Sequence, residues 1–221
     1  MKTTTILTAL AIASTLVVGA GCGGCFSTTP KEQQQLERAQ PVRESPPLPN
    51  GTYQIQSIAY DDADGAYRVF LIDPPPSTPP LYTTTKLQLA RLTDEEIAAG
   101  DAKARLVVDG ATVAGHLPTA FAIQYTHNEV EERDGQPVVV QQHSSTWSPF
   151  MSAMAGAAIG NMLFAPRYYY PPPYVGGGLT GFGGAGATPA AAQASYTQQH
   201  GKAPQAARLS TSGYAKAPST K

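Results

Sequence analysis

Alternation of apolar and polar residues runs through the segment from residue 51 to residue 147 and indicates half-buried β-strands. Two such runs, 53–60 and 67–72, flank a short segment rich in Asp and Gly, and together they predict a β-hairpin. The first run carries apolar side chains at both odd and even positions. A regular strand there would have apolar area on both of its faces.

The segment between these runs contains Asp61, Asp62, Asp64 and Gly65, which are typical of a tight turn. Three close aspartates are also found in calcium loops. An EF-hand loop needs an acidic ligand six residues after its glycine, and that position holds Leu71. We therefore interpret the aspartates as turn residues.

Further strands are predicted from the same alternation at 81–92, 105–109, 120–130 and 138–144. The last two flank an Asp-Gly pair at 134–135 and predict a second hairpin. Between the strands, Thr93 followed by Glu96 predicts a capping box at the start of a short helix. The fold class predicted for the domain is mainly β (α+β), with one antiparallel sheet and a short helix over residues 51–147. A barrel and a sandwich both fit this pattern.

A helix is predicted over residues 148–165, with Ser148 as N-cap, Pro149 at its first position and Pro166 as its terminator. Gly156 and Gly160 are four residues apart and form a small-residue (GxxxG) ridge that favours close approach of another backbone. The ridge fits packing on the β domain, self-association or contact with a membrane. We expect Gly156 and Gly160 to make a helix contact, with a protein partner or a second copy among the candidates.

The two flanking regions are poor in large apolar side chains. Residues 22–50 are predicted to form a flexible tether, and residues 166–221 a disordered tail rich in Tyr, Pro and Gly. All 16 acidic residues precede position 135, so the net charge of −1 combines an acidic first part with a sparsely basic tail. Cations this sparse do not predict nucleic-acid binding.

The N-terminus has the pattern of a secretory signal peptide over residues 1–21. Lys2 precedes an apolar run over residues 6–18, which is shorter than the roughly 20 residues that span a bilayer. Small residues then lead to Cys22, and this segment resembles the lipobox of bacterial lipoproteins. The resemblance implies a diacylglycerol (and later palmitate-type acylation) on Cys22, and a cell-membrane or outer-membrane location facing the non-cytoplasmic side. Cleavage after Ala20 and simple secretion is the alternative.

Cys22 and Cys25 are the only cysteines and match C-x-x-C, the spacing of a redox pair. A thioredoxin-like site would need a strand before the pair and a helix after it. Here the pair lies between a signal peptide and a tether, so no redox role is predicted. With no further cysteine, neither a disulfide framework nor a structural zinc site of the cysteine-rich type is expected.

Catalytic motifs are not apparent, and no catalytic residue, metal site or cofactor is predicted. The four histidines lack metal-binding spacings, although His127 and His143 can meet across the second predicted hairpin. The leading interpretation is a lipid-anchored cell-envelope protein that acts as a structural or interaction module without catalysis. The alternative is a secreted or anchored hydrolase or ligand-binding protein, whose site would combine His127, His143 and a carboxylate such as Glu129.

Overall fold

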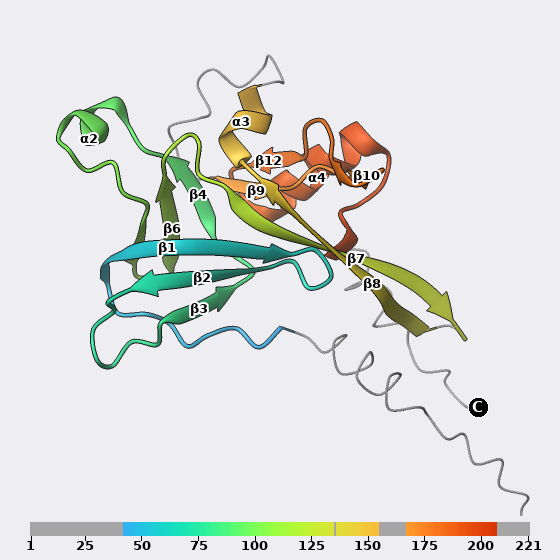
Figure 1. Ribbon diagram of the computed structural model, residues 1–221, viewed down its shortest axis with the longest axis horizontal. Helices are drawn as coiled ribbons and strands as arrows, with labels where there is room; N and C mark the ends of the chain where they lie inside the picture. Colours follow the sequence, from blue (N-terminus) through green and yellow to red (C-terminus); the bar gives the residue numbers. More distant parts are fainter. Residues whose placement is uncertain (1–41, 135, 155–166, 207–221) are drawn as a thin grey trace, which may run out of the picture.

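The computed structural model describes residues 42–134, 136–154 and 167–206, and it has the mainly β (α+β) fold expected from the sequence (Figure 1). The predicted lipidation site Cys22 and the ridge glycines Gly156 and Gly160 lie outside the described residues. Both remain predictions. Within the described part of the chain, no helix is long and apolar enough to cross a membrane.

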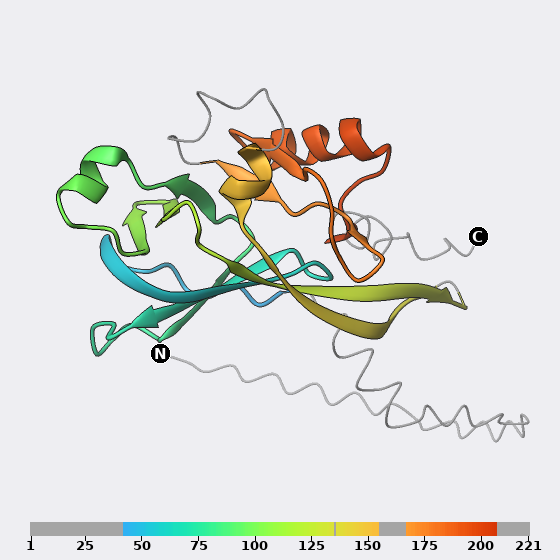
Figure 2. The same ribbon diagram turned by 45° about the horizontal axis from the view of Figure 1, so that its top comes forward.

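Eight strands form the main sheet. They are β1 (Gly51–Asp61), β2 (Ala66–Ile72), β3 (Leu81–Thr84), β4 (Gln88–Arg91), β5 (Arg105–Asp109), β6 (Thr112–Leu117), β7 (Ile123–Arg133) and β8 (Gln136–Trp147). The strand order is β3-β2-β1-β5-β6-β4, and the β7–β8 pair joins the sheet through β1. Figure 2 shows this last hairpin extending beyond the other strands.

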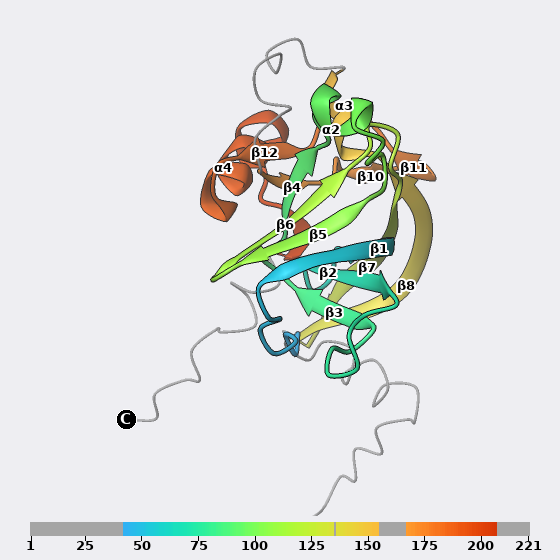
Figure 3. The same ribbon diagram turned by 90° about the vertical axis from the view of Figure 1, so that its left-hand side faces the viewer.

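The sheet forks along one edge of β1. Residues 51–54 of β1 pair antiparallel with β5, whereas residues 59–61 pair in parallel with β7. The fork separates the β5–β6–β4 branch from the β7–β8 branch, and the sheet curls (Figure 3). The parallel pairs β1–β7 and β4–β6 make the sheet mixed, where the sequence predicted antiparallel pairing.

A β-bulge explains why β1 carries apolar residues at both odd and even positions. The register with β2 shifts between Ile55 and Ser57, so the strand changes phase there. Tyr53 and Ile55 before the bulge are buried, and so are Ile58 and Tyr60 after it. The expectation of two half-apolar faces is therefore corrected: these side chains belong to the same core cluster.

Both hairpins predicted from the sequence are present. β1 pairs with β2 across the aspartate-rich turn, and β7 pairs with β8 so that Arg133 faces Gln136. Asp134 adopts a positive φ of 53°, the conformation that a two-residue hairpin turn requires. The capping box of Thr93 and Glu96 starts α2 (Asp94–Ala98) as predicted.

The single strand predicted over residues 81–92 is wrong. The chain forms β3, which pairs with β2, and then β4, which pairs with β6 at the other end of the strand order. Leu87, between the two strands, is buried in the core with 1% of its surface exposed. The interruption around Leu87 lets the chain pass from one end of the strand order to the other. The alternation of apolar and polar residues does not show where a chain leaves one strand pair and joins another.

The prediction of a disordered tail from residue 166 is corrected for residues 167–206. These residues form β9 (Tyr168–Tyr170), β10 (Tyr174–Val175), β11 (Gly178–Leu179), β12 (Gly184–Gly186) and α4 (Pro189–His200), which we call the C-terminal layer. Strand β9 pairs with β12, and Arg167 forms a bridge to Leu89 of β4. In Figures 1 and 3 the layer lies beside the main sheet.

Local signals account for α4. Thr188 caps the helix by accepting a hydrogen bond from the Ala191 amide, Pro189 occupies its first turn, and Gly201 ends it with a φ of 65°. Glycines let α4 approach closely. A Cβ on Gly184 or Gly186 would overlap backbone atoms of α4. The glycine-rich composition here serves packing, whereas the sequence interpretation assigned it to a disordered chain.

The start of the predicted 148–165 helix is α3 (Pro149–Met154). Phe150 is fully buried and meets the Tyr169 ring edge-on, with centroids 6.0 Å apart. The described part of this helix thus contacts the domain core. The end of the predicted tether also contacts the domain: Leu48 is buried, and the Ser45 amide donates to the Thr83 carbonyl of β3.

Candidate binding site

A cavity of about 210 Å³ lies between the end of β1, β7 and the C-terminal layer. Its walls are dominated by tyrosine and proline, with one acidic, one imidazole and one basic side chain. The tyrosines are Tyr60, Tyr125, Tyr170, Tyr174 and Tyr196. Asp62, His127 and Lys202 supply the charged and titratable groups. Such a concave site with a few convergent polar groups is the usual form of a small-ligand site.

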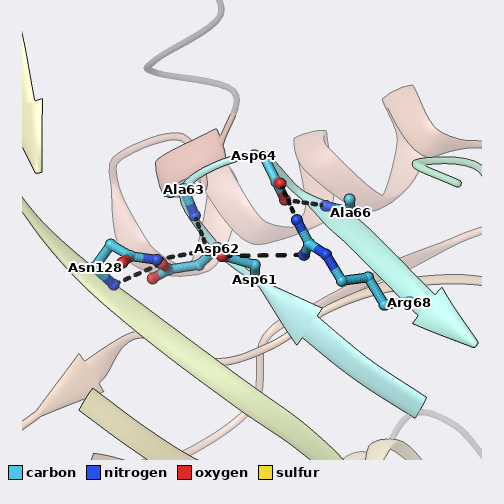
Figure 4. A network of polar contacts seen from close by, with 7 residues as sticks. All are labelled: Asp61, Asp62, Ala63, Asp64, Ala66, Arg68 and Asn128. Atoms are coloured by element: carbon cyan, nitrogen blue, oxygen red, sulfur yellow. Dashed lines mark hydrogen bonds and ion pairs between the residues drawn. The ribbon is translucent and has the colours of Figure 1, made fainter. Parts of the chain in front are cut away.

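Asp62 is the best-connected polar group of this cavity, although only 6% of its surface is exposed. One carboxylate oxygen, Oδ2, accepts from the Tyr125 hydroxyl at 2.9 Å and lies 2.5 Å from His127 Nδ1. The other oxygen, Oδ1, accepts from the backbone amide of Asn128 at 2.9 Å (Figure 4). Three donors on β7 therefore hold one buried carboxylate, as a buried charge requires.

The turn after β1 places Asp62 against β7. Asp61 Oδ1 accepts from the Ala63 amide at 3.0 Å, and Asp64 Oδ1 accepts from the Ala66 amide at 2.9 Å. Arg68 donates to Asp64 at 2.6 Å (Figure 4). The two outer aspartates thus shape the turn as predicted from the sequence, and the middle one points to the neighbouring strand.

Four rings stand in a row beside this carboxylate. Tyr60 and Tyr125 lie at paired positions of β1 and β7, with centroids 6.0 Å apart and planes inclined by 10°. Tyr125 and His127 follow at 6.4 Å and 11°, and Tyr174 of the C-terminal layer covers His127 at 4.7 Å and 12°. The near-parallel planes mean that neighbouring ring faces point toward one another.

The Tyr60 hydroxyl makes no hydrogen bond to another described residue. Tyr60 is 2% exposed and lines the cavity. Burial, followed by the neighbouring Tyr67, raises the pKa of Tyr60 well above its usual value. Burial and the Asp62 charge likewise raise the pKa of Tyr125. Both hydroxyls therefore stay protonated at neutral pH and act as donors.

The C-terminal layer supplies Tyr174 of this row and most of the remaining cavity wall. The Gln205 side chain donates to the Asn128 carbonyl of β7, which ties the end of the layer to the strand that carries the site. His200, at the end of α4, contacts the Phe182 carbonyl at 2.7 Å. Lys202 lies exposed at the cavity wall between these two anchors. Sequence analysis missed this wall because it assigned the whole segment to a disordered tail.

The structure brings together His127, His143 and a carboxylate, as the sequence suggested, but with a different carboxylate from the one expected. His127 and His143 face each other across the hairpin, with ring centroids 6.2 Å apart. The carboxylate beside His127 is Asp62, whereas Glu129 is exposed. Within residues 42–134, 136–154 and 167–206, no group of three His, Cys, Asp or Glu side chains is placed to hold a metal ion.

Comparison with known proteins does not assign this arrangement to a family. The chain matches no protein-family model, and neither a curated protein nor a solved structure matches it. The fold and the cavity therefore carry the functional argument.

Asp61 predicts a pH dependence of stability. Its burial raises its pKa to about 6, against an ordinary value of 3.8, even though the Ala63 amide and Arg68 oppose the shift. The folded state therefore favours the protonated form of Asp61. The stability that this preference contributes is fully present below about pH 4 and is lost as pH rises through about 6. The parent protein should lose up to about 3 kcal/mol of its free energy of unfolding between about pH 4 and pH 6 through this residue. Asp61→Asn cannot ionise at this position, so it should not show this loss.

Urea unfolding at a series of pH values between 4 and 7 measures this effect. Asn at position 61 keeps the oxygen that accepts from Ala63 and Asn128. The exposed Asp109→Asn is the matched control and should follow the parent protein. Equal pH slopes for Asp61→Asn and the parent would contradict the assignment.

Proposed function

We propose that this protein is a lipid-anchored cell-envelope protein that works without catalysis, as a module that binds a ligand in the Asp62 cavity. The single observation that carries the binding role is the cavity itself, which is lined by the Asp62 carboxylate and by the Tyr60 hydroxyl, a group with no hydrogen bond to another described residue. Such a hydroxyl can donate to a ligand in the cavity without breaking a hydrogen bond to those residues.

The lipobox-like segment at Cys22 supports the location. A lipid there would attach the chain to a membrane ahead of residue 42, where the described structure begins. The Ser45 amide and the Leu48 side chain already contact the β domain. Few residues therefore separate the proposed anchor at Cys22 from the domain that carries the cavity. The proposed module would thus work near the membrane surface.

A hydrolase is the second candidate, and the Asp62–His127 pair is the observation that favours it. A carboxylate that holds Nδ1 orients the ring, so that Nε2 is the nitrogen left to act as a base toward a water molecule. The described residues that line the cavity include no serine, threonine or cysteine for the imidazole to activate. We therefore favour binding. Turnover of chromogenic esters or glycosides that is lost in His127→Asn would instead establish the hydrolase.

The proposed anchor is tested by membrane fractionation and by mass spectrometry of the mature N-terminus. We expect Cys22→Ala to move the protein from the membrane fraction to the soluble fraction, because the acyl chains are lost. Cys25→Ala is the matched control and should stay with the membrane. An unmodified Cys22, or membrane retention of Cys22→Ala, would contradict the anchor and leave the cavity to be tested separately.

A further inference from the structure

The ring geometry determines which part of each aromatic side chain a ligand can meet. The planes of Tyr60, Tyr125, His127 and Tyr174 are near-parallel from each ring to the next, so these four rings stand in a row and do not surround a common point. A cage for a quaternary ammonium group needs free ring faces around the cation. The four rings therefore do not form such a cage, and the polar groups of Tyr60, Asp62 and Lys202 at the cavity favour a ligand held by hydrogen bonds.

The polar groups around the cavity offer a ligand one acceptor and two donors. Asp62 lines the wall and retains acceptor capacity on Oδ1, which receives one hydrogen bond in the described structure. Lys202 supplies an ammonium group at the same cavity. The two opposite charges give the cavity no net preference for an anion or a cation, so hydrogen bonding is the interaction that both groups can offer to one ligand. An uncharged ligand that both donates to Asp62 and accepts from Tyr60 and Lys202 satisfies all three.

The size of the cavity narrows the ligand further. Its volume of about 210 Å³ lies below the roughly 300–1,000 Å³ of sites for drug-sized molecules. One small ring with several hydroxyl groups fits this limit. Prolines 171–173 add a rigid apolar wall against which the C–H surface of such a ring can pack.

We propose that the Asp62 cavity binds an uncharged polyhydroxylated ring, that is, a single saccharide residue. Asp62 accepts from ligand hydroxyls, while the Tyr60 hydroxyl and the Lys202 ammonium donate to them. This inference rests on the proposed binding function and adds the ligand class. This saccharide unit can be a free monosaccharide or the terminal unit of a glycan chain.

Saturation-transfer NMR on the detergent-solubilised full-length protein tests this inference. The probes are glucose and N-acetylglucosamine as free sugars, cellotetraose as a chain, and tetramethylammonium and acetate as charged comparisons. We expect a saccharide to bind with a Kd of roughly 1 mM. Binding of the free sugars or of the tetrasaccharide supports the inference, and the stronger of the two identifies the source.

Tyr60→Phe locates the binding. Loss of its hydroxyl should weaken saccharide binding about fivefold, the size of one hydrogen bond, with little change in melting temperature because no described protein group pairs with it. Tyr53→Phe is the matched control, since the Tyr53 hydroxyl donates to the Pro49 carbonyl and Tyr53 does not line the cavity. It should bind like the parent protein.

Three results would overturn the inference. Saccharide binding that is unchanged in Tyr60→Phe would place the sugar elsewhere. Binding of tetramethylammonium or acetate alone, reduced in Tyr60→Phe, would replace the ligand class and leave the proposed binding function intact. Failure of every probe to bind would count against both the ligand class and the cavity as a ligand site.

Discussion

Asp62→Ala is expected to destabilise the protein by about 3–5 kcal/mol, because it leaves three donors of β7, two of them buried, without their acceptor. The Tyr125 hydroxyl, His127 Nδ1 and the Asn128 amide all lose the same carboxylate. Total stabilities are commonly about 5–15 kcal/mol, so the loss is a large fraction of the whole. Calorimetry should show a fall in melting temperature of about 10 °C.

Asp109→Ala is the matched control for this variant. Asp109 is exposed at the end of β5, and its replacement should change stability by no more than about 0.5 kcal/mol. Asp62→Asn should fall between the two, because an amide oxygen can still accept from Asn128. Equal melting temperatures for Asp62→Ala and Asp109→Ala would show that the carboxylate does not hold the end of β1 to β7.

Gly184→Ala is expected to displace α4 from the C-terminal layer. A Cβ at this position would overlap the Ala192 carbonyl and come within 2.7 Å of the Tyr196 Cβ. These are backbone and near-backbone atoms, so a rotamer change cannot relieve the clash. We expect a loss of about 3 kcal/mol, at the upper end of overpacking effects. Urea unfolding followed by tyrosine fluorescence measures it.

Gly178→Ala provides the control within the same layer. Nothing lies within 4 Å of a Cβ at Gly178, and its backbone φ suits ordinary residues. Its stability should match that of the parent protein. If Gly184→Ala and Gly178→Ala were equally stable, α4 would not be packed against β12 as described. Displacement of α4 should also open the cavity wall that Tyr196 forms.

The parts of the fold that local patterns govern could be predicted from the sequence. The hairpins at 61–65 and 134–135 and the capping box at Thr93 follow from turn and cap chemistry within a few residues. The C-terminal layer had local signals too, with Thr188 before a proline and Gly201 at the helix end. Composition outweighed these signals, because glycines that permit close packing resemble glycines of a disordered chain.

The candidate site was only half predictable for a different reason. Sequence alternation places Tyr125 and His127 on one face of β7, and hairpin symmetry brings His143 to His127. Asp62 joins them through the parallel pairing of β1 with β7, across 65 residues of chain. No local pattern encodes that pairing. Asp62 therefore looked like its neighbours Asp61 and Asp64, which do form the turn.

Residues 167–206 fold against β4 and β7 and close the Asp62 cavity, and the proposed binding function depends on this packing. Hydrogen exchange of the full-length protein, followed by mass spectrometry of peptides from β9 and α4, tests it most directly. We expect protection of both elements in the parent protein and faster exchange of α4 in Gly184→Ala. Exchange of both elements in the parent protein at the rate of an unstructured chain would contradict it.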